Sequence, residues 1–502
     1  MQSKDNYIER SSGILMPLFS LPSPYGIGTL GQSAREFVDF LSDAHQAWWQ
    51  ILPVGPTSYG DSPYQSLSTY AGNPYLIDLD ILKADGLLTA DEIEQMYWGD
   101  NSERVDYGAL YQNRFVLLKK AMERGFDRDK EKIEEFEADN SDWLPDYTLY
   151  MALKRHFDMR PWTHWPDDAA RLRKPEALKK YREKLTDDIK LFTYIQYLFF
   201  SQWKELREYA HNKGIGIIGD IPIYVALDSV DVWASPEEFM LDEKGFPSEV
   251  AGVPPDYFTA EGQLWGNPLY NYDKMKEDGY GWWVRRIGGA SKIYDVIRID
   301  HFRGFESFWA VPYGDKNAIN GHWKKGPGMS LIGVLKERFP HIRFIAEDLG
   351  YPSPEVVQLL KDSGFPGMKV LEFAFDSRDS SNYLPHAYTD NCVCYAGTHD
   401  NDTLKGWLEK INQDDFKKAV EYLGLNEKEG YIWGILRGGM SSVARLFVTQ
   451  MQDYLELDNS ARMNTPGNPE GNWQWRMGKG KLTPELAEKI ACMTRLYDRA
   501  NA

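Results

Sequence analysis

Residues 296–304 read Val-Ile-Arg-Ile-Asp-His-Phe-Arg-Gly, and the rest of the chain is arranged around this stretch. Its aliphatic residues predict a short buried strand. The strand would carry Arg298, Asp300 and His301 to its C-terminal end, where Gly304 lets the backbone turn away. Because an unpaired buried charge is costly, this ionisable cluster requires a structural or a chemical reason.

Two interpretations of Asp300 are open at this point. In the first, Arg298 or Arg303 holds the carboxylate in place to pin a turn, as a structural ion pair does. In the second, Asp300 is a catalytic nucleophile. A neighbouring guanidinium would then hold the pKa of its carboxyl down, so that the side chain stays ionised.

Seven further segments predict strands, and several of them alternate with predicted helices near 33–45, 330–338 and 354–362. The seven are 48–54, 75–80, 215–225, 343–347, 368–375, 393–398 and 458–464. Near-continuous apolar strands joined by helices are typical of a parallel sheet, and eight of them favour an α/β fold of the (β/α)8 TIM-barrel type. A doubly wound sheet is the alternative. The polar strand ends disfavour it, as does the lack of a glycine-rich phosphate loop after the first strand.

The predicted organisation is a single catalytic barrel over residues 1–502 with large insertions and no separate C-terminal β-sandwich domain. Residues 10–31 are rich in Gly, Pro and Ser and predict a long ordered loop. Residues 85–205 have helical periodicity and predict a mainly helical insertion. Residues 230–285 predict an irregular insertion, in which aromatic residues at about 252–268 form either a lid over the active site or a hydrophobic tether.

Charge and composition exclude some classes of function. The net charge of -18 argues against a nucleic-acid or anionic-membrane surface. Aromatic residues are 14% of the chain, with 17 Trp, 30 Tyr and 23 Phe. They either fill a large core or provide flat platforms for a neutral ligand such as a sugar, and composition leaves both possibilities open.

The three cysteines, Cys392, Cys394 and Cys492, predict no disulfide framework and no metal site. Cys392 and Cys394 have strand spacing, which is typical of small buried side chains. The N-terminal residues lack the apolar segment of a signal peptide, and no run approaches the length of a membrane span. We therefore expect a cytoplasmic protein.

Three carboxylates, Asp300, Glu347 and Asp400, lie at or just beyond the C-terminal ends of separate predicted strands. In a barrel these ends meet on the face where catalysis takes place. The residues that flank the carboxylates are Arg298, His301 and His399. One such carboxylate is ordinary, whereas three with these neighbours indicate a site, in which the histidines suit hydrogen bonds to a hydroxylated substrate.

A divalent cation could also occupy three carboxylates. Arg298 would compete with it for the same anionic groups, and the chain has no EF-hand-like loop. Acetal chemistry suits the set better: one carboxylate attacks the anomeric carbon, a second donates a proton to the leaving oxygen, and a third stabilises the oxocarbenium charge. The first two must be roughly 5–5.5 Å apart for a covalent intermediate, which Asp300 and Glu347 at adjacent strand ends can satisfy.

Six sequence blocks resemble those of amylomaltases, the 4-alpha-glucanotransferases (disproportionating enzymes) of glycoside hydrolase family 77. The catalytic blocks are Arg-Ile-Asp-His-Phe-Arg-Gly (298–304), Ile-Ala-Glu-Asp-Leu-Gly (345–350) and Gly-Thr-His-Asp-Asn-Asp-Thr (397–403). The others are Gly-Asp-Ser-Pro-Tyr-Gln (60–65), Gly-Asp-Ile-Pro-Ile-Tyr-Val (219–225) and Gln-Leu-Trp-Gly-Asn-Pro (263–268). The resemblance runs from about residue 10 to residue 477, which is essentially the whole chain.

The resemblance implies a retaining enzyme with Asp300 as nucleophile, Glu347 as acid/base and Asp400 as transition-state stabiliser. It implies direct sugar contacts for Arg298, His301, His399 and Asp220. It places along the donor and acceptor cleft the residues Ser62, Tyr64, Asp256, Gln263, Trp265, Asp348 and Asp376, and adds Asn464 from the block Arg-Met-Asn-Thr-Pro-Gly (462–467).

The implied substrates are maltooligosaccharides, amylose or starch, with glucose as an acceptor, and neither a cofactor nor a metal is implied. We expect a monomer or a small homo-oligomer that binds no nucleic acid and no membrane. The chemistry of the residues does not itself say whether water or a sugar resolves the intermediate. A retaining alpha-glucan hydrolase and a non-catalytic glucan-binding protein are therefore the alternatives.

Overall fold

The structure is a computed structural model that describes residues 8–58, 60–255, 259–350, 353–376, 383–468 and 470–500. Within these ranges one sheet contains eight parallel strands. They are β1 (Ser11–Leu15), β2 (Trp48–Gln50), β3 (Gly216–Pro222), β6 (Val296–Asp300), β9 (Arg343–Ala346), β10 (Gly367–Val370), β11 (Cys392–Tyr395) and β12 (Leu446–Gln450). Their spatial order is β10-β11-β12-β1-β2-β3-β6-β9, so the strands follow one another around the sheet and the last pairs with the first.

The two ends of this sheet meet between β9 and β10. The backbone N–H of Ala346 donates to the carbonyl of Pro366, just before β10, at 3.0 Å. A parallel sheet of eight strands that closes on itself, with helices around it, is a (β/α)8 barrel. The predicted fold class is therefore confirmed.

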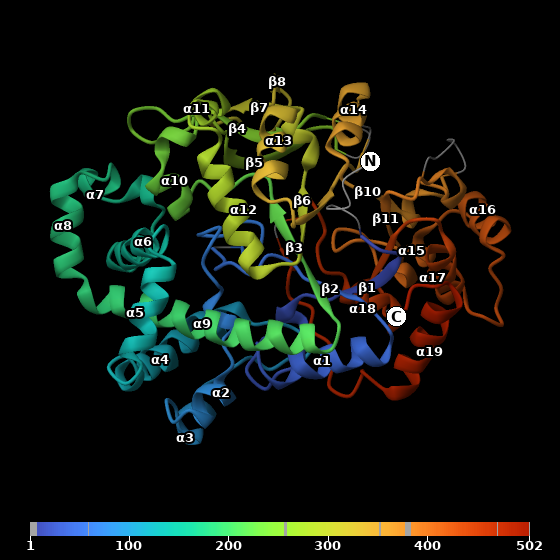
Figure 1. Ribbon diagram of the computed structural model, residues 1–502, viewed down its shortest axis with the longest axis horizontal. Coiled ribbons are helices and arrows are strands. Elements are labelled where there is room, and N and C mark those ends of the chain that lie inside the picture. Colours follow the sequence, from blue (N-terminus) through green and yellow to red (C-terminus); the bar gives the residue numbers. More distant parts are fainter. Residues whose placement is uncertain are drawn as a thin grey trace.

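Helices surround the barrel (Figure 1). Outside the insertions they are α1 (Gln32–Asp43), α2 (Leu79–Ala84), α12 (Gly281–Ile293), α13 (Met329–Arg338), α14 (Pro354–Ser363), α15 (Leu404–Lys410), α16 (Gln413–Leu423), α17 (Tyr431–Ser441), α18 (Met451–Tyr454) and α19 (Pro484–Leu496). Helices α1, α13 and α14 confirm the helices predicted near 33–45, 330–338 and 354–362. No helix in the described part of the chain is both long and apolar enough to cross a membrane.

Two of the predicted strands are wrong, although the predicted total of eight is right. Residues 75–80 form a 3-10 turn and the start of α2, because the side chains of Asn73 and Asp78 accept backbone N–H groups and cap these turns. Residues 458–464 contain another 3-10 turn, which Asp458 caps through the N–H of Ser460. Side-chain caps of this kind favour turns over strands.

Two strands of the barrel, β1 and β12, were not predicted. Strand β1 lies inside the stretch 10–31 that predicts a loop. It contains Ser11, Ser12 and Gly13 itself, although all five of its residues are buried. Strand β12 is the buried run Leu-Phe-Val-Thr-Gln, which follows α17 after a turn of only four residues, Ser442 to Arg445. Strands β1 and β12 pair with each other. We call this pair the seam of the barrel, because here the last strand in the sequence meets the first.

The barrel strands are buried on both faces. Alternate side chains point inward and form one compact cluster, which contains Leu15, Trp48, Ile218, Val296, Ile345, Met368, Val370, Val393, Tyr395, Leu446 and Val448. The residues between them, such as Ile297 and Ile299, belong to the larger core. Two-sided burial explains why these strands are almost continuously apolar in the sequence.

Arg499 bridges the N-terminal ends of β1 and β12. Its guanidinium is fully buried and donates only to backbone carbonyls. Its acceptors, at 2.8 to 3.1 Å, are the carbonyl oxygens of Ser11, Met440, Ser442, Ala444 and Arg445. One side chain near the C-terminus thus joins the start of the first strand to the turn before the last.

The segment predicted as a helical insertion is helical and lies at one side of the barrel (Figure 1). Its helices are α3 (Ala90–Glu94), α4 (Tyr107–Gly125), α5 (Lys130–Asp139), α6 (Leu144–His156), α7 (Asp168–Arg171), α8 (Pro175–Lys184) and α9 (Thr186–Asn212). Helix α9 is 27 residues long and runs back beneath the barrel to β3. The insertion as a whole separates β2 from β3.

The segment 230–285 is more regular than predicted. It contains α10 (Val230–Ala234), β4 (Glu249–Val253), β5 (Gln263–Pro268) and α11 (Tyr272–Glu277). With β7 (Ser307–Pro312) and β8 (His322–Lys325), the two strands form an antiparallel sheet of order β5-β4-β7-β8 at the top of Figure 1. The stretch predicted as a lid is therefore a hairpin of this sheet, and its residues 256–258 lie outside the described residues.

Candidate active site

Strand β6 carries a buried charge into the mouth of the barrel. Arg298 lies opposite Asp220 of β3, and its Nη1 donates to Asp220 Oδ2 at 2.6 Å and to Asp300 Oδ1 at 3.1 Å. Arg298 and Asp220 are almost completely buried, whereas Asp300 is partly open. One guanidinium thus holds two carboxylates at neighbouring strand ends, and only Asp300 of the two is open to a ligand.

The backbone turn after Asp300 holds Glu347. His301 adopts a left-handed conformation with φ +56°, which is uncommon for a residue other than glycine. In this turn the N–H of His301 donates to Glu347 Oε2 at 2.7 Å, and the N–H of Leu349 donates to Oε1 at 2.9 Å. Because Ile299 pairs with Ala346, Asp300 and Glu347 follow at adjacent strand ends, as predicted.

Asp400 enters from the other side of the barrel mouth. Asn464 Nδ2 donates to Asp400 Oδ1 at 2.6 Å, and His399 Nε2 lies 3.4 Å from the same oxygen. Arg462 donates to the backbone carbonyl of Asp400 at 2.6 Å and also pairs with the carboxylate of Asp402. The side chain of Asp400 is 43% exposed, compared with 28% for that of Asp300.

Aromatic rings form the walls of the site. Tyr64 donates from its hydroxyl to Asp220 Oδ2 at 2.8 Å, and its ring stacks on His399 with 5.2 Å between centroids. Trp265 and His301 meet edge to face, with 4.7 Å between their ring centroids. Both predicted histidines are therefore held in place by aromatic residues of the predicted cleft.

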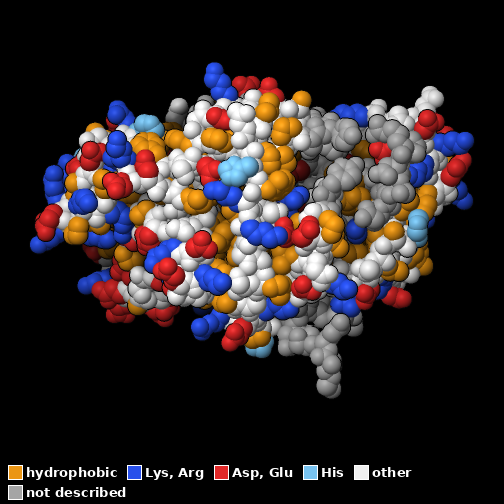
Figure 2. All heavy atoms as spheres, turned by 90° about the horizontal axis from the view of Figure 1, so that it is seen from above, with side chains coloured by type: hydrophobic (Ala, Val, Ile, Leu, Met, Phe, Trp, Pro, Cys, Tyr) orange, Lys and Arg blue, Asp and Glu red, His pale blue; other side chains and the backbone are white. Residues whose placement is uncertain are grey.

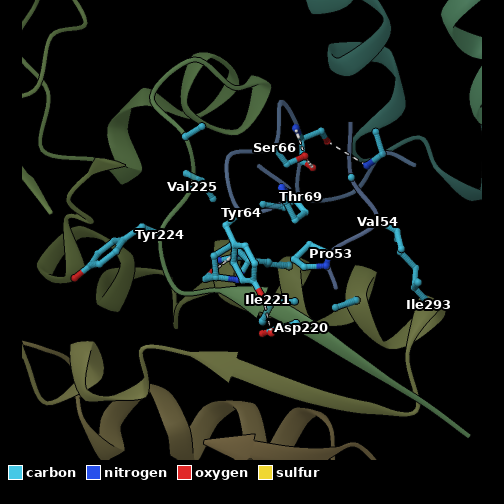
Figure 3. Close-up of a pocket in the computed structure, with 18 of the residues that line it drawn as sticks. Pro53, Val54, Tyr64, Ser66, Thr69, Asp220, Ile221, Tyr224, Val225 and Ile293 are labelled. Atoms are coloured by element: carbon cyan, nitrogen blue, oxygen red, sulfur yellow. Dashed lines mark hydrogen bonds between the residues drawn. The ribbon is translucent and has the colours of Figure 1, made fainter. Parts of the chain in front are cut away.

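Figure 3 shows the side of the site behind Tyr64. The ring of Tyr64 stands over Asp220, with its hydroxyl directed at the carboxylate. Pro53, Val54 and Thr69 line the same small cavity of about 50 Å³. The second oxygen of Asp220, Oδ1, is buried and has no hydrogen-bond partner among the described residues.

The pKa of Asp300 does not follow the prediction. Burial raises the pKa of Asp300 well above its usual value, the charges of Asp220 and Glu347 add to this rise, and Arg298 opposes it without cancelling it. Burial also raises the pKa of Glu347, against Arg298 and the two backbone N–H groups. The pair of carboxyl groups therefore holds a proton more tightly than isolated carboxylic acids do.

The two histidines of the site are neutral at physiological pH. Burial, with help from the charge of Arg303, lowers the pKa of His301 to about 3. Burial also lowers the pKa of His399, and the opposing effect of Asp400 is smaller. Neutral imidazoles can donate and accept hydrogen bonds, which suits contacts to sugar hydroxyls.

Four of the predicted cleft residues form hydrogen bonds that do not involve Asp300, Glu347 or Asp400. The Ser62 hydroxyl accepts the N–H of Tyr64 at 3.3 Å and shapes its loop, and Gln263 accepts from Trp265 Nε1 at 3.1 Å. Asp348 accepts the N–H of Met368 at 2.7 Å, which supports the barrel wall. The backbone carbonyl of Asp376 accepts from Lys418. The remaining cleft prediction, Asp256, lies outside the described residues.

Two residues of the site were missed. Arg462 stands in the same block as Asn464, and its hydrogen bonds to Asp400 and to the carbonyl of Asn464 at 2.8 Å organise both. Trp473 packs against Tyr64 and His399, with centroid distances of 5.7 and 6.0 Å. Its position in a Gly- and Asn-rich loop is the same signal that singled out Trp265. Among the described residues, no group of three or more His, Cys, Asp or Glu side chains is arranged to hold a metal ion.

Known proteins match this chain over nearly its full length. The family model described as glycoside hydrolase family 77, 4-alpha-glucanotransferase, matches residues 16–482. The 4-alpha-glucanotransferase of Clostridium butyricum is 50% identical over 96% of this chain and 100% of its own length. That of Streptococcus pneumoniae is 48% identical over 98% of each chain.

Comparison with solved structures also points to this family. Amylomaltase from Streptococcus agalactiae in complex with acarbose superposes with a TM-score of 0.96 at 43% identity, over 98% of this chain and 100% of that one. Amylomaltase from Corynebacterium glutamicum shares the fold, with a TM-score of 0.75 at 19% identity over 98% of this chain and 74% of that one. The chain belongs to the 4-alpha-glucanotransferases of glycoside hydrolase family 77.

Proposed function

We propose that this protein transfers a segment of 1,4-alpha-glucan from a donor maltooligosaccharide or starch chain to the 4-OH of an acceptor glucan or of glucose. The reaction is a double displacement through a covalent glucosyl-enzyme intermediate, with retention at the anomeric carbon. The observation that carries the proposal is the position of Asp300. It accepts a hydrogen bond from buried Arg298 and is followed directly by the turn that binds Glu347.

In the first step Asp300 attacks the anomeric carbon of the donor. Arg298 occupies Oδ1, so we assign Oδ2 as the attacking oxygen. The bond from the anomeric carbon to the leaving 4-oxygen breaks as the bond to Oδ2 forms. Glu347 gives its proton to the departing 4-oxygen, which leaves as the free 4-OH of the released chain.

The tightly held proton of the carboxyl pair belongs on Glu347 in this scheme. Arg298 makes a charge-assisted hydrogen bond to Asp300, whereas Glu347 accepts from neutral backbone N–H groups. A charge-assisted bond favours the anion more strongly, so Asp300 is the partner that stays ionised. The raised pKa of Glu347 suits an acid that must hold a proton near neutral pH.

In the second step the acceptor resolves the intermediate. Glu347, now a carboxylate, removes the proton of the acceptor 4-OH while that oxygen attacks the anomeric carbon and Asp300 departs. Asp400 stabilises the positive charge that develops on the sugar ring in both steps. Asn464 and His399 hold its Oδ1, which fixes the direction of the carboxylate.

Transfer requires that a sugar reaches the intermediate before water does. The hairpin of β4 and β5 brings Trp265 against His301 at the catalytic turn, which supports a role for the stretch 252–268 as a cover over the site. A covered site excludes water, and an aromatic face offers an acceptor sugar a surface on which to stack.

Incubation with pure maltotriose tests the proposed function. We expect glucose and a ladder of longer oligosaccharides while the total number of reducing ends stays constant. Rising reducing ends without a ladder would instead identify an alpha-glucan hydrolase. No change at all would leave a glucan-binding protein.

The division of the chain is a proposal as well. We propose one catalytic barrel, with the helical segment 85–205 and the segment 230–285 as insertions that shape the cleft. A cytoplasmic monomer or small homo-oligomer that needs no cofactor remains the prediction from the sequence.

A further inference from the structure

The outer face of the small antiparallel sheet carries an exposed tryptophan. Trp309 of β7 pairs with Trp323 of β8, and the residues beside Trp309, Phe308 and Ala310, point the other way into the core. Trp323 is therefore on the face directed away from the barrel, where its side chain is 45% exposed. Exposing a large aromatic ring to water is unfavourable, and a ligand that covers the ring would recover this free energy. The exposed indole therefore suggests an interaction site.

The ring of Trp323 is held rigidly. Its neighbour Trp309 meets it edge to face with 5.2 Å between centroids, and Trp309 Nε1 is itself fixed by the carbonyl of Ala318 at 2.8 Å. The guanidinium of Arg303 lies 4.4 Å from the centre of the Trp323 ring. A ring that is already fixed loses little conformational entropy when a ligand stacks on it.

An open hollow of about 410 Å³ lies at the end of β8. Lys325 shares the outer face of β8 with Trp323 and lines this hollow. The polar side chains of the lining are Glu306, Lys325, Glu355, Gln358 and Asp362. Figure 2 looks down on this end of the molecule, where hydrophobic side chains lie among charged ones.

The hollow adjoins the catalytic turn. The N–H of Gly326 donates to the carbonyl of Glu306 at 2.7 Å, and that of Gly328 donates to Phe305 at 2.8 Å. Phe305 ends the 3-10 turn (Phe302–Phe305) that follows Asp300 and His301. On its other side the hollow is bounded by α14, the helix that follows Glu347 along the chain.

We propose that Trp323 and this hollow form an auxiliary binding site for 1,4-linked alpha-glucan chains, next to the catalytic cleft but separate from it. The inference rests on the proposed function for the choice of glucan as ligand. A sugar ring can stack on the part of the indole that Arg303 leaves exposed, while carboxylate, amide and ammonium groups of the hollow reach its hydroxyls. Three carboxylates in the lining disfavour an anionic ligand, whereas a neutral polyhydroxyl chain meets no charge repulsion.

The site distinguishes long chains from short ones. A maltotriose molecule occupies the catalytic cleft without reaching beyond it, so its turnover does not depend on Trp323. A long amylose chain can contact both places, and the second contact raises its effective affinity. Chain length is therefore the variable to change in the experiment.

The variant Trp323→Ala is compared with wild type and with Tyr313→Ala, which removes another exposed aromatic ring at the end of the same sheet. We expect the KM for amylose to rise about three- to tenfold in Trp323→Ala, the size of a lost aromatic stacking contact. The kinetics with maltotriose should stay unchanged. Trp323→Phe keeps a ring and should retain part of the effect, and Tyr313→Ala should behave as wild type.

Native electrophoresis through a gel that contains amylose measures binding without turnover. Wild type should be retarded, and Trp323→Ala should be retarded less. Unchanged KM and mobility in Trp323→Ala would overturn the proposal and leave the patch to another partner, such as a protein. An equal loss with maltotriose would also overturn it, because Trp323 would then act by supporting Arg303 and the catalytic turn. If wild type forms no ladder from maltotriose, the proposed function fails, while the gel still reports on Trp323.

Discussion

At the scale of single residues, Arg298 lies buried between Asp220 and Asp300 and fixes the charge of the site. A buried cation needs its partners, since a lone charge in the interior destabilises the fold. Burial raises the pKa of Asp300, and the negative charges of Asp220 and Glu347 add to this rise even though Arg298 touches Asp300. The proposed mechanism needs this excess of negative charge around Arg298, because one carboxyl group must keep a proton.

Replacement of Asp300 by Asn tests the nucleophile. The amide cannot form the glucosyl ester, so we expect kcat to fall at least about a thousandfold. Binding of maltooligosaccharides, measured by calorimetry, should be largely kept, because Arg298 retains Asp220. Turnover close to that of wild type would remove Asp300 from its assigned role.

Arg462 is a positioning residue for Asp400. It joins the backbone of Asp400, the carboxylate of Asp402 and the backbone of Asn464. In Arg462→Gln we expect kcat to fall about ten- to hundredfold, as for a displaced catalytic group, with little change in KM. Arg462→Lys should recover part of the loss.

The matched control for Arg462 is Lys410→Ala, since Lys410 also pairs with Asp402 but is exposed. This variant should keep the wild-type kcat. If both variants lose activity equally, the charge on Asp402 is responsible and the positioning of Asp400 is not.

The raised pKa of Glu347 predicts a stability effect that depends on pH. A carboxyl whose pKa is higher in the folded protein stabilises the fold below its unfolded pKa, and this stabilisation is lost as the pH rises through the folded pKa. Glu347→Gln removes the ionisation, so its Tm at pH 7–8 should exceed that of wild type by about 1–3 °C. Near pH 3 the difference should vanish. A lower Tm at pH 8 than at pH 3, relative to wild type, would contradict this account.

Motifs in the sequence pointed to the charged centre of the site and to Asn464, which holds Asp400, but not to Arg462 or Trp473. Asp300, Glu347 and Asp400 stand at strand ends, where an unpaired charge is conspicuous. Asp348 lies next to Glu347 and looks alike in sequence, yet its carboxylate faces the backbone of Met368. Neighbours in a strand-end loop point in different directions, and local sequence does not specify which.

At the scale of secondary structure elements, apolar runs predicted six of the eight barrel strands. The two failures at 75–80 and 458–464 share a cause, because polar side chains cap turns within segments that carry strand-forming residues. Strand β1 was not predicted because it is five residues long, contains Ser11, Ser12 and Gly13, and is followed closely by Pro17. The hairpin of β4 and β5 was not predicted, because β4 also pairs with β7 and the barrel strand β6 lies between them in the sequence.

Trp265→Ala tests the role of that hairpin. The indole of Trp265 on β5 packs against His301, so its loss opens the side of the site where we propose that the acceptor sugar binds. We expect the ratio of transfer to hydrolysis to fall about three- to tenfold, the effect of one lost stacking contact on acceptor affinity. Oligosaccharide ladders and reducing ends, counted in the same reaction, measure the ratio. An unchanged ratio would assign water exclusion to another part of the chain.

At the scale of the whole molecule, the barrel unites side chains from distant parts of the chain, and Arg499 holds its seam. Arg499→Ala would remove five hydrogen bonds to buried carbonyls and leave a cavity. Arg10 still donates to the carbonyls of Met440, Ser442 and Ala444, and the N–H of Ser11 to that of Arg445. We therefore expect a loss of about 2–4 kcal/mol in the free energy of unfolding. Burial lowers the pKa of Arg499 to about 10, which still leaves it charged at neutral pH.

Activity at 25 °C should be close to that of wild type in Arg499→Ala, because the residue lies far from the barrel mouth. Arg495→Ala, which breaks an exposed pair with Glu488, is the control and should change stability little. Urea unfolding of the three proteins measures the difference. Equal stability of both variants would show that the seam does not depend on Arg499.

The pairing of β1 with β12 has a consequence for synthesis of the protein. Ser11 finds its partner in Leu446, so the first strand leaves the ribosome long before the last one exists. During that interval one edge of β1 is unsatisfied, and such an edge attracts other strands. Nascent chains of this protein therefore remain vulnerable to aggregation until translation is nearly complete, and chaperones that shield strand edges should raise the yield of folded enzyme.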